Sequence, residues 1–224
     1  MDLRVSDVAR LLGESEETIY RMAREGEMPA HRVHEQYCFN RVELQEWAAT
    51  RGRRLPPELY GDVAARARTG LRGALERGGI TYRLPGTRRE EVLAAVARLP
   101  GLPASIDRAL LEELLLGREQ LASTGIGGGI AIPHPREPLV ARIDEPIVLL
   151  TFLAQPVDFH AIDGEPVRVL FTLLSPTVKL HLQVLSRLAF ALHDQPLGEL
   201  LRSEAPADAI LARVAALDAR APTP

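Results

Sequence analysis

The feature that most constrains this chain is a run of glycines followed by a histidine between two prolines. Residues 125–136 read GIGGGIAIPHPR. Three consecutive glycines allow backbone conformations that other residues rarely adopt, so we expect a sharp turn here. Pro133 and Pro135 each favour an extended backbone at the preceding residue. The pattern predicts a short buried strand and, just after it, a rigidly held His134.

This combination of glycines and histidine favours a site that receives a phosphoryl group. An imidazole can act as a nucleophile near neutral pH, and backbone N–H groups in a glycine loop can hold an anion. We assign phosphate binding to the glycine turn and its surroundings: Gly127, Gly128, Gly129 and Thr124. A tight turn that merely ends in a histidine, with Thr124 as a turn or capping residue, remains the alternative.

Two other kinds of site fit the segment poorly. A P-loop would need Gly-Lys-Ser/Thr after the glycines, and none follows. A metal site would need a second ligand near His134 at helical or Cys-x-x-Cys spacing. The chain contains a single cysteine and no such partner, so we expect neither a metal nor a cofactor.

The segment resembles the phosphohistidine signature of the fructose, mannitol and nitrogen-type enzyme IIA domains of the bacterial phosphotransferase system. The resemblance covers about residues 78–217, and further segments follow the family pattern in the same order: Arg118-Glu119, Ser123-Thr124-Gly125, 163–167, 173–176 and 181–189. It implies that His134 accepts a phosphoryl group from the phosphocarrier protein HPr.

The same resemblance implies that Arg118 and His181 lie close to His134. A guanidinium presents a planar pair of donors to phosphate oxygens, and an imidazole can donate one more hydrogen bond. Simpler roles remain open for both residues. Arg118 follows a predicted helix, where cations are common, and His181 lies beside an apolar stripe, where it would be a buried structural residue.

Residues 78–218 alternate between helix and strand patterns, and we assign them to one domain. Strands are predicted at 80–84, 147–152, 157–159 and 167–174. Helices are predicted from Thr87, over 106–116 with Gly117 as the stop, over 178–192, and in two later segments, 196–201 and 207–217. We expect an α/β domain with a mixed sheet flanked by helices on both faces, and a flexible tail at 219–224.

Residues 1–54 form a separate unit with two short helices, two short strands and a closing helix. Ser6 and Ser15 are the expected N-caps of the first two helices. The pattern resembles the excisionase-type winged helix-turn-helix related to MerR regulators. This implies a recognition helix over 16–25 and a wing over 30–39.

The charges of residues 1–54 argue against assuming DNA binding. Nine basic residues face ten acidic ones, so the unit lacks the basic footprint that usually supplies affinity for phosphates. Arg21, Arg24 and Arg32 remain candidates for contacts with DNA. A protein-docking use of the same fold stays open.

Residues 55–77 are predicted to be a helical linker. Pro56-Pro57 gives a stiff exit from the first unit, and apolar residues at helical spacing follow. Such a helix is either a solvated connector or a dimerising element, so a homodimer is left open.

The composition limits the setting. The chain has 224 residues, a net charge of −3 and one cysteine, Cys38, which excludes an internal disulfide and favours a reducing compartment. It has no apolar run of about 20 residues and no signal-peptide pattern at its start, so we expect a cytoplasmic protein without membrane insertion.

We therefore predict a phosphohistidine carrier with a regulatory role, nitrogen-type or transcriptional, exerted through the first unit. Two alternatives stay open. One is an enzyme IIA component that passes phosphate to the IIB domain of a permease in sugar transport. The other is a non-catalytic regulator that binds a partner protein.

Overall fold

The computed structural model describes residues 3–33, 36–40, 43–44, 47–48, 70–139 and 143–220. The chain divides into two compact units, one formed by Met1–Arg68 and Leu139–Glu145 and the other by Thr69–Pro138 and Pro146–Pro224. The predicted linker helix over 55–69, the wing tip at 34–35 and the end of the tail at 221–224 lie outside the described residues.

The N-terminal unit is a helix-turn-helix with a small sheet, as the sequence predicted. Its elements are β1 (Leu3–Arg4), α1 (Val5–Leu12), α2 (Glu16–Arg24), β2 (His31–Val33) and β3 (Gln36–Phe39). The strands form an antiparallel sheet in the order β1-β3-β2. The start of the closing helix is described only in part, and its Leu44 and Trp47 are buried in the core of this unit.

Of the two predicted N-caps in this unit, Ser15 is confirmed and Ser6 is wrong. Ser15 caps α2, because its Oγ accepts a hydrogen bond from the Thr18 N–H at 3.1 Å. Ser6 is not the cap of α1, which already begins at Val5. There the Asp7 carboxylate accepts a hydrogen bond from the Arg4 N–H at 3.0 Å and satisfies the helix start instead.

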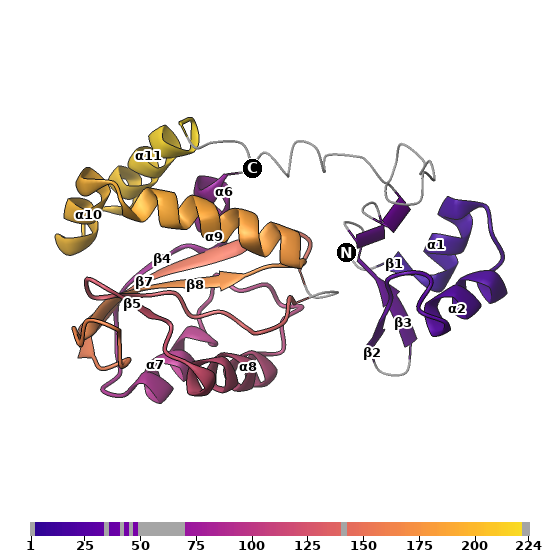
Figure 1. Ribbon diagram of the computed structural model, residues 1–224, viewed down its shortest axis with the longest axis horizontal. Coiled ribbons are helices and arrows are strands. Elements are labelled where there is room, and N and C mark those ends of the chain that lie inside the picture. The colour runs from indigo at the N-terminus through magenta and orange to yellow at the C-terminus, as the bar shows by residue number, and fades with distance from the viewer. Residues whose placement is uncertain are drawn as a thin grey trace. The chain divides into compact units, whose positions relative to one another are not determined.

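The second unit is a five-stranded mixed sheet with helices on both faces, as predicted (Figure 1). The strand order is β4-β7-β8-β6-β5, with β4–β7 and β6–β8 parallel and the other pairs antiparallel. The strands are β4 (Ile80–Leu84), β5 (Gly125–Gly127), β6 (Ile130–Ala131), β7 (Ile147–Val157) and β8 (Val167–Leu174). The helices are α6 (Leu71–Gly78), α7 (Arg89–Val96), α8 (Arg108–Leu121), α9 (Val178–Leu192), α10 (Gln195–Arg202) and α11 (Ala207–Asp218).

Alternate residues of the central strands supply two core layers. Side chains such as Val148 and Phe171 pack against α6, α9, α10 and α11, while α7 and α8 cover the opposite face (Figure 1). The central strands β7 and β8 are buried along most of their length, which explains their nearly continuous apolar sequences. The predicted separate strand at 157–159 is not formed, since β7 continues through Pro156 to Val157.

The largest differences between the predicted and the observed helices of the second unit concern α6 and α8. Residues 71–77, assigned to the linker, form most of α6, and Leu71, Ala74 and Leu75 are buried in the core of this unit. Helix α8 does not stop at Gly117 but continues to Leu121. A helical glycine costs only about 1 kcal/mol, and the buried face formed by Leu111, Leu115 and Glu119 carries the helix through it.

We expect two glycine-to-alanine substitutions in helices of this unit to change stability in opposite directions. A Cβ on Gly78 would lie 2.3 Å from the carbonyl oxygen of Val148, whereas a Cβ on Gly117 would meet no atom within 4 Å. Gly78→Ala should lower the free energy of unfolding by about 1–3 kcal/mol through overpacking. Gly117→Ala should raise it by about 0.5–1 kcal/mol through helix propensity. Urea unfolding measures both, and destabilisation by Gly117→Ala would contradict this account of α8.

Candidate functional site

Three side chains from different elements meet at one end of the second unit. His134 lies in the loop that follows β6, Arg118 in the last turn of α8, and His181 in the first turns of α9. The Arg118 Nε lies 3.2 Å from the His134 Nε2. The centroids of the two imidazole rings are 5.2 Å apart, and the ring planes are tilted by 46°. His134 is half-buried, so its ring is held by the protein but still reachable from solvent.

The backbone around His134 fixes the orientation of its ring. Its Nδ1 lies 2.8 Å from the carbonyl oxygen of Ile132. A carbonyl only accepts, so Nδ1 must carry the proton, and Nε2 of the neutral ring is then an acceptor. Arg118 Nε–H donates to that Nε2. The two bonds are consistent with one tautomer, in which the bare nitrogen is Nε2.

Arg118 is held in place by the end of its own helix. Its Nη1 donates to the carbonyl oxygen of Ala122 at 2.8 Å, one of the carbonyls that a helix end leaves without an intrahelical partner. This contact leaves the Nε edge of the guanidinium directed at His134. The continuation of α8 beyond Gly117 is therefore what carries Arg118 to the site.

The surroundings keep both imidazoles neutral near pH 7. Burial lowers the pKa of His134 below its ordinary value, the hydrogen bond to Ile132 opposes this shift, the Arg118 guanidinium adds to it, and the Glu119 carboxylate opposes it. Burial also lowers the pKa of His181, and the nearby His134 lowers it further. A neutral His134 has the free lone pair that a nucleophile needs, and a neutral His181 can still donate one hydrogen bond.

Comparison with known proteins decides the family. Residues 75–216 match the family described as "Phosphoenolpyruvate-dependent sugar phosphotransferase system, EIIA 2". The chain belongs to this family. Residues 3–52 match the helix-turn-helix domain family, in agreement with the N-terminal unit.

Individual relatives support the same assignment of the enzyme IIA domain. A nitrogen regulatory protein of Pseudomonas aeruginosa is 38% identical over 144 residues, which span 62% of this chain and 91% of the relative. A fructose-specific EIIA component of Haloferax volcanii is 39% identical over 101 residues, 44% of this chain and 64% of that protein. The crystal structure of the nitrogen regulatory protein IIA-Ntr from Neisseria meningitidis aligns with a TM-score of 0.53 and 30% identity, covering 62% of this chain and 93% of that one.

The glycine turn of this enzyme IIA domain is not brought to His134, contrary to the arrangement that the sequence suggested. Gly129 pairs with β8 at Arg168 and Val169, whereas Pro133 pairs with it at Leu173. Val169 and Leu173 are four residues apart on β8, so Gly129 and Pro133 lie about 13 Å apart along this strand. The turn therefore lies toward the far end of β6, and we do not include it in the site.

The glycines have a structural role instead. Gly127, Gly128 and Gly129 all have positive φ angles and form the turn between β5 and β6. The Gly128 N–H, which was expected to face a phosphate, donates to the Asp163 carboxylate at 2.8 Å. This contact lowers the pKa of Asp163, because a backbone donor stabilises the ionised form.

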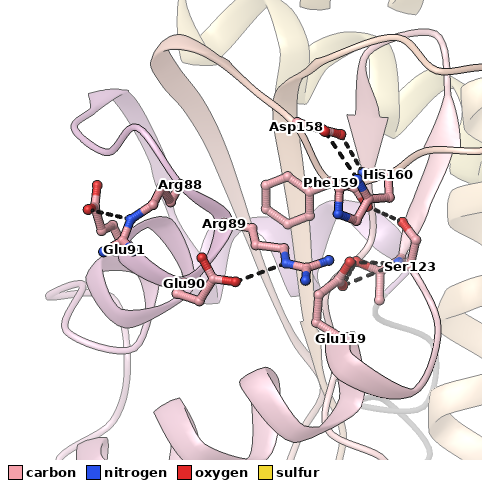
Figure 2. Close-up of polar contacts among 10 residues, drawn as sticks. Arg88, Arg89, Glu90, Glu91, Glu119, Ser123, Asp158, Phe159 and His160 are labelled. Carbon is pink, nitrogen blue, oxygen red and sulfur yellow. Dashed lines mark hydrogen bonds and ion pairs between the residues drawn. The ribbon is translucent and has the colours of Figure 1, made fainter.

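Thr124 lies closer to the site, but its polar groups point elsewhere. Its N–H and its hydroxyl both donate to the carboxylate of Glu119. Glu119 is buried, with 4% of its surface exposed, and Figure 2 shows its carboxylate directed from α8 toward the segment at Ser123. Sequence reasoning noted Glu119 only as the neighbour of Arg118. A carboxylate on the buried face of a helix was the signal that could have singled it out.

The remaining surroundings of the site are a small cavity and an apolar rim. The cavity, of about 70 Å³, is bounded by residues of the loop after His134, the end of β8 and the start of α9, among them Arg136, Ser175 and His181. Exposed Leu121 and Leu182 lie on α8 and α9, beside Arg118 and His181.

The described residues contain no group of three or more His, Cys, Asp or Glu that could hold a metal ion. Within the same part of the chain, no helix is both long enough and apolar enough to span a bilayer.

The three arginines proposed for DNA contact are exposed on the N-terminal unit. Arg21 and Arg24 lie on α2 and Arg32 on β2. Arg21 is paired with Glu25 at 3.1 Å and lies 3.8 Å from Glu27, so its charge is partly neutralised within the unit. Arg24 lies 3.9 Å from Glu25, a longer and weaker pairing.

The effect of the Arg118 charge on His134 can be tested by measuring the pKa of His134. Since this guanidinium lowers the pKa of His134, Arg118→Gln should raise that pKa. A pH titration of the histidine ring nitrogens by NMR measures it. Arg202→Gln on α10 is the matched control and should leave the titration of His134 unchanged. A fall in the pKa of His134 in the Arg118 variant would contradict the geometry described above.

Proposed function

We propose that this protein is a phosphohistidine carrier in which Nε2 of His134 accepts a phosphoryl group from HPr. The observation that carries the proposal is the tautomer: Nδ1 is held by the Ile132 carbonyl, which leaves a lone pair on Nε2. In the transfer, the bond from Nε2 to phosphorus forms as the phosphorus–nitrogen bond of the donor histidine breaks. The electron pair of that bond stays on the donor ring, and Nδ1 of His134 keeps its proton.

Arg118 and His181 are placed to stabilise the group in transfer. Phosphoryl transfer spreads negative charge over the phosphate oxygens, and catalysis depends mostly on positioning and on charge stabilisation. Arg118 contacts Nε2 in the unphosphorylated protein, so an incoming phosphoryl group must take over that donor. His181, whose ring is 5.2 Å from that of His134, can donate one further hydrogen bond to an oxygen. These groups supply donors without a metal ion.

The rim of the site favours a protein as the phosphoryl donor. Val178 lies one helical turn before His181 and Leu182 on α9, and Leu121 is one helical turn beyond Arg118 on α8. All three apolar side chains are exposed. Apolar residues around a polar centre are typical of a surface that a protein partner covers. A small phosphorylated metabolite would gain little from them.

We further propose that the carrier has a regulatory role rather than a dedicated role in sugar uptake. Its relatives include several proteins named nitrogen regulatory protein, and the helix-turn-helix unit adds a second binding module to the same chain. A phosphoryl group on His134 adds negative charge, which can alter the binding of a partner. Transfer to a IIB domain is the competing function. The complex of mannitol-specific IIA with phosphorylated IIB from Escherichia coli, at 20% identity, shows only that the fold is shared.

The carrier function predicts a single phosphorylation at one histidine. Incubation with enzyme I, HPr and phosphoenolpyruvate should add one phosphoryl group per chain, measured by intact mass at alkaline pH. His134→Ala should abolish it. His193→Ala, which removes an exposed histidine near the end of α9, should be phosphorylated like the wild type. Phosphorylation of the His134 variant to the wild-type level would exclude the assignment.

A second candidate function, DNA binding, concerns the N-terminal unit. The helix-turn-helix match over residues 3–52 and the exposed Arg24 on α2 favour it. Acidic residues on and next to the same helix, among them Glu25 and Glu27, oppose it by repelling phosphates and by pairing with Arg21. The unit therefore needs contacts to bases or to a bent duplex, or a second copy, to bind tightly.

Charge-changing substitutions on α2 test this candidate. If α2 faces DNA, Arg24→Gln should weaken binding to a random-sequence duplex and reduce the slope of log affinity against log salt by about 1. Glu25→Gln should strengthen binding, because it removes a repulsive charge. Fluorescence anisotropy at two or more salt concentrations measures both, with Arg98→Gln in the second unit as the control. Salt-independent binding, or none, would favour protein docking.

A further inference from the structure

The buried carboxylate of Glu119 lies beside the phosphoryl site but takes no part in the transfer described above. It follows Arg118 directly on α8, and it points to the buried side of the helix while Arg118 reaches His134. Burial of a charged carboxylate is costly unless several hydrogen bonds offset it. The burial of Glu119 therefore depends on the hydrogen bonds that its carboxylate accepts.

Within the described residues, the hydrogen bonds that the Glu119 carboxylate accepts all come from one residue, Thr124. The Thr124 N–H lies 3.2 and 3.1 Å from the two carboxylate oxygens, and the Thr124 hydroxyl donates to Oε2 at 2.5 Å. Both partners are buried. The carboxylate thereby joins the C-terminal end of α8 to the segment that leads into β5, five residues further along the chain.

Thr124 is linked in turn to the backbone that orients His134. Its carbonyl oxygen accepts a hydrogen bond from the Ile132 N–H at 3.0 Å. The carbonyl of the same Ile132 accepts the Nδ1–H of His134 at 2.8 Å. Two residues, Thr124 and Ile132, therefore lie between the carboxylate and the imidazole: Glu119 holds Thr124, Thr124 holds Ile132, and Ile132 holds the ring.

We propose that Glu119 is a positioning residue for His134, acting through Thr124 and Ile132 to hold the ring with Nδ1 protonated and Nε2 bare. The role rests on the proposed phosphoryl transfer and specifies how the acceptor is prepared for it. Glu119 and Arg118 then act on opposite sides of the ring. Glu119 supports the protonated nitrogen through the backbone, and Arg118 contacts the reactive one.

The charge of Glu119 acts in the same direction as its hydrogen bonds. Two charged groups shift the pKa of His134, Arg118 and Glu119, both from α8. The titratable group that faces it from α9 is His181, whose own pKa is lowered by His134. Glu119 raises the pKa of His134 and so opposes the effects of burial and of Arg118. A more basic ring nitrogen is a better nucleophile. The carboxylate thus keeps the half-buried ring reactive as well as oriented.

The competing explanation is a purely structural cap, in which Glu119 only fixes the turn between α8 and β5. Both roles predict some loss of stability when the contact is removed. Only the positioning role predicts a change in the tautomer and pKa of His134, two quantities that can be measured without any phosphoryl donor. The test therefore reads the ring directly and remains informative even if HPr proves not to be the donor.

The experiment compares four substitutions in the full chain. Glu119→Gln removes the charge and one acceptor at almost constant size. Thr124→Val removes the hydroxyl, and Thr124→Ser retains it. Thr151→Val is the matched control, because Thr151 is a buried threonine whose hydroxyl finds no hydrogen-bond partner in the described part of the chain. NMR of the histidine ring nitrogens gives the tautomer and pKa of His134, and transfer from phosphorylated HPr gives kcat and KM separately.

The expected result is a mixed tautomer population of His134 in Glu119→Gln and Thr124→Val. In Glu119→Gln the pKa of His134 should also fall. Both variants should lose about tenfold in kcat with KM nearly unchanged, equivalent to about 1.4 kcal/mol of transition-state stabilisation. Thr124→Ser should restore the wild-type tautomer and rate, and Thr151→Val should retain them.

Two outcomes would overturn the proposal. One is a wild-type tautomer and pKa of His134 in both Glu119→Gln and Thr124→Val, which would leave Glu119 with a structural role alone. The other is an equal change in Thr151→Val, which would show a general response of the core to a lost hydroxyl. Absence of phosphorylation in the wild type, with the ring changes still present in the variants, would reject the carrier function but not the positioning role.

Discussion

The hydrogen bond between Nδ1 of His134 and the carbonyl of Ile132 determines what the rest of the site can do. A backbone carbonyl accepts and never donates, so this one contact assigns the proton of the neutral ring and leaves the lone pair on Nε2. The carbonyl is available because Ile132 continues the direction of β6, whose N–H groups and carbonyls are organised by the sheet. The orientation of a single side chain thus depends on the pairing of β6 with β8 and on the link from Thr124.

The fold supplies the partners of this ring from elements that are far apart in the chain. Helix α8 delivers Arg118 from one side, and α9, which follows β8, delivers His181 from the other. Ends of helices and loops next to strands are common places for binding groups, because a rigid scaffold holds them while solvent can still reach them. Half-burial of His134 follows from this position. Burial lowers the pKa of the ring, which favours its neutral form, and the ring stays partly exposed to solvent.

The glycine turn shows how a motif can be recognised correctly while its parts are misassigned. The three glycines precede His134 closely in sequence, and this proximity suggested a phosphate cradle. An extended strand separates residues by about 3.3 Å each, so a few intervening residues are enough to place the turn well away from the imidazole. Positive φ angles explain why glycine is needed there, and Asp163 already occupies the Gly128 N–H. The phosphate contacts proposed here therefore come from side chains on α8 and α9.

The sequence alone determined the two-unit organisation, the α/β class, His134 as the candidate acceptor, and Arg118 and His181 as its companions, because these depend on periodicity and on a motif with ordered segments. Tertiary structure decided the rest. Propensity favoured a stop at Gly117, but packing of Leu115 and Glu119 carried α8 onward and brought Arg118 to the ring. The sequence of residues 71–77 is compatible with a solvated connector, but in the structure Leu71 and Leu75 are buried in the core. The sequence alone could not predict which nitrogen of His134 lacks a proton, nor the position of Glu119. Both depend on hydrogen bonds that form only in the folded chain: from Thr124 to Glu119 on α8, and from Ile132, just after β6, to Thr124.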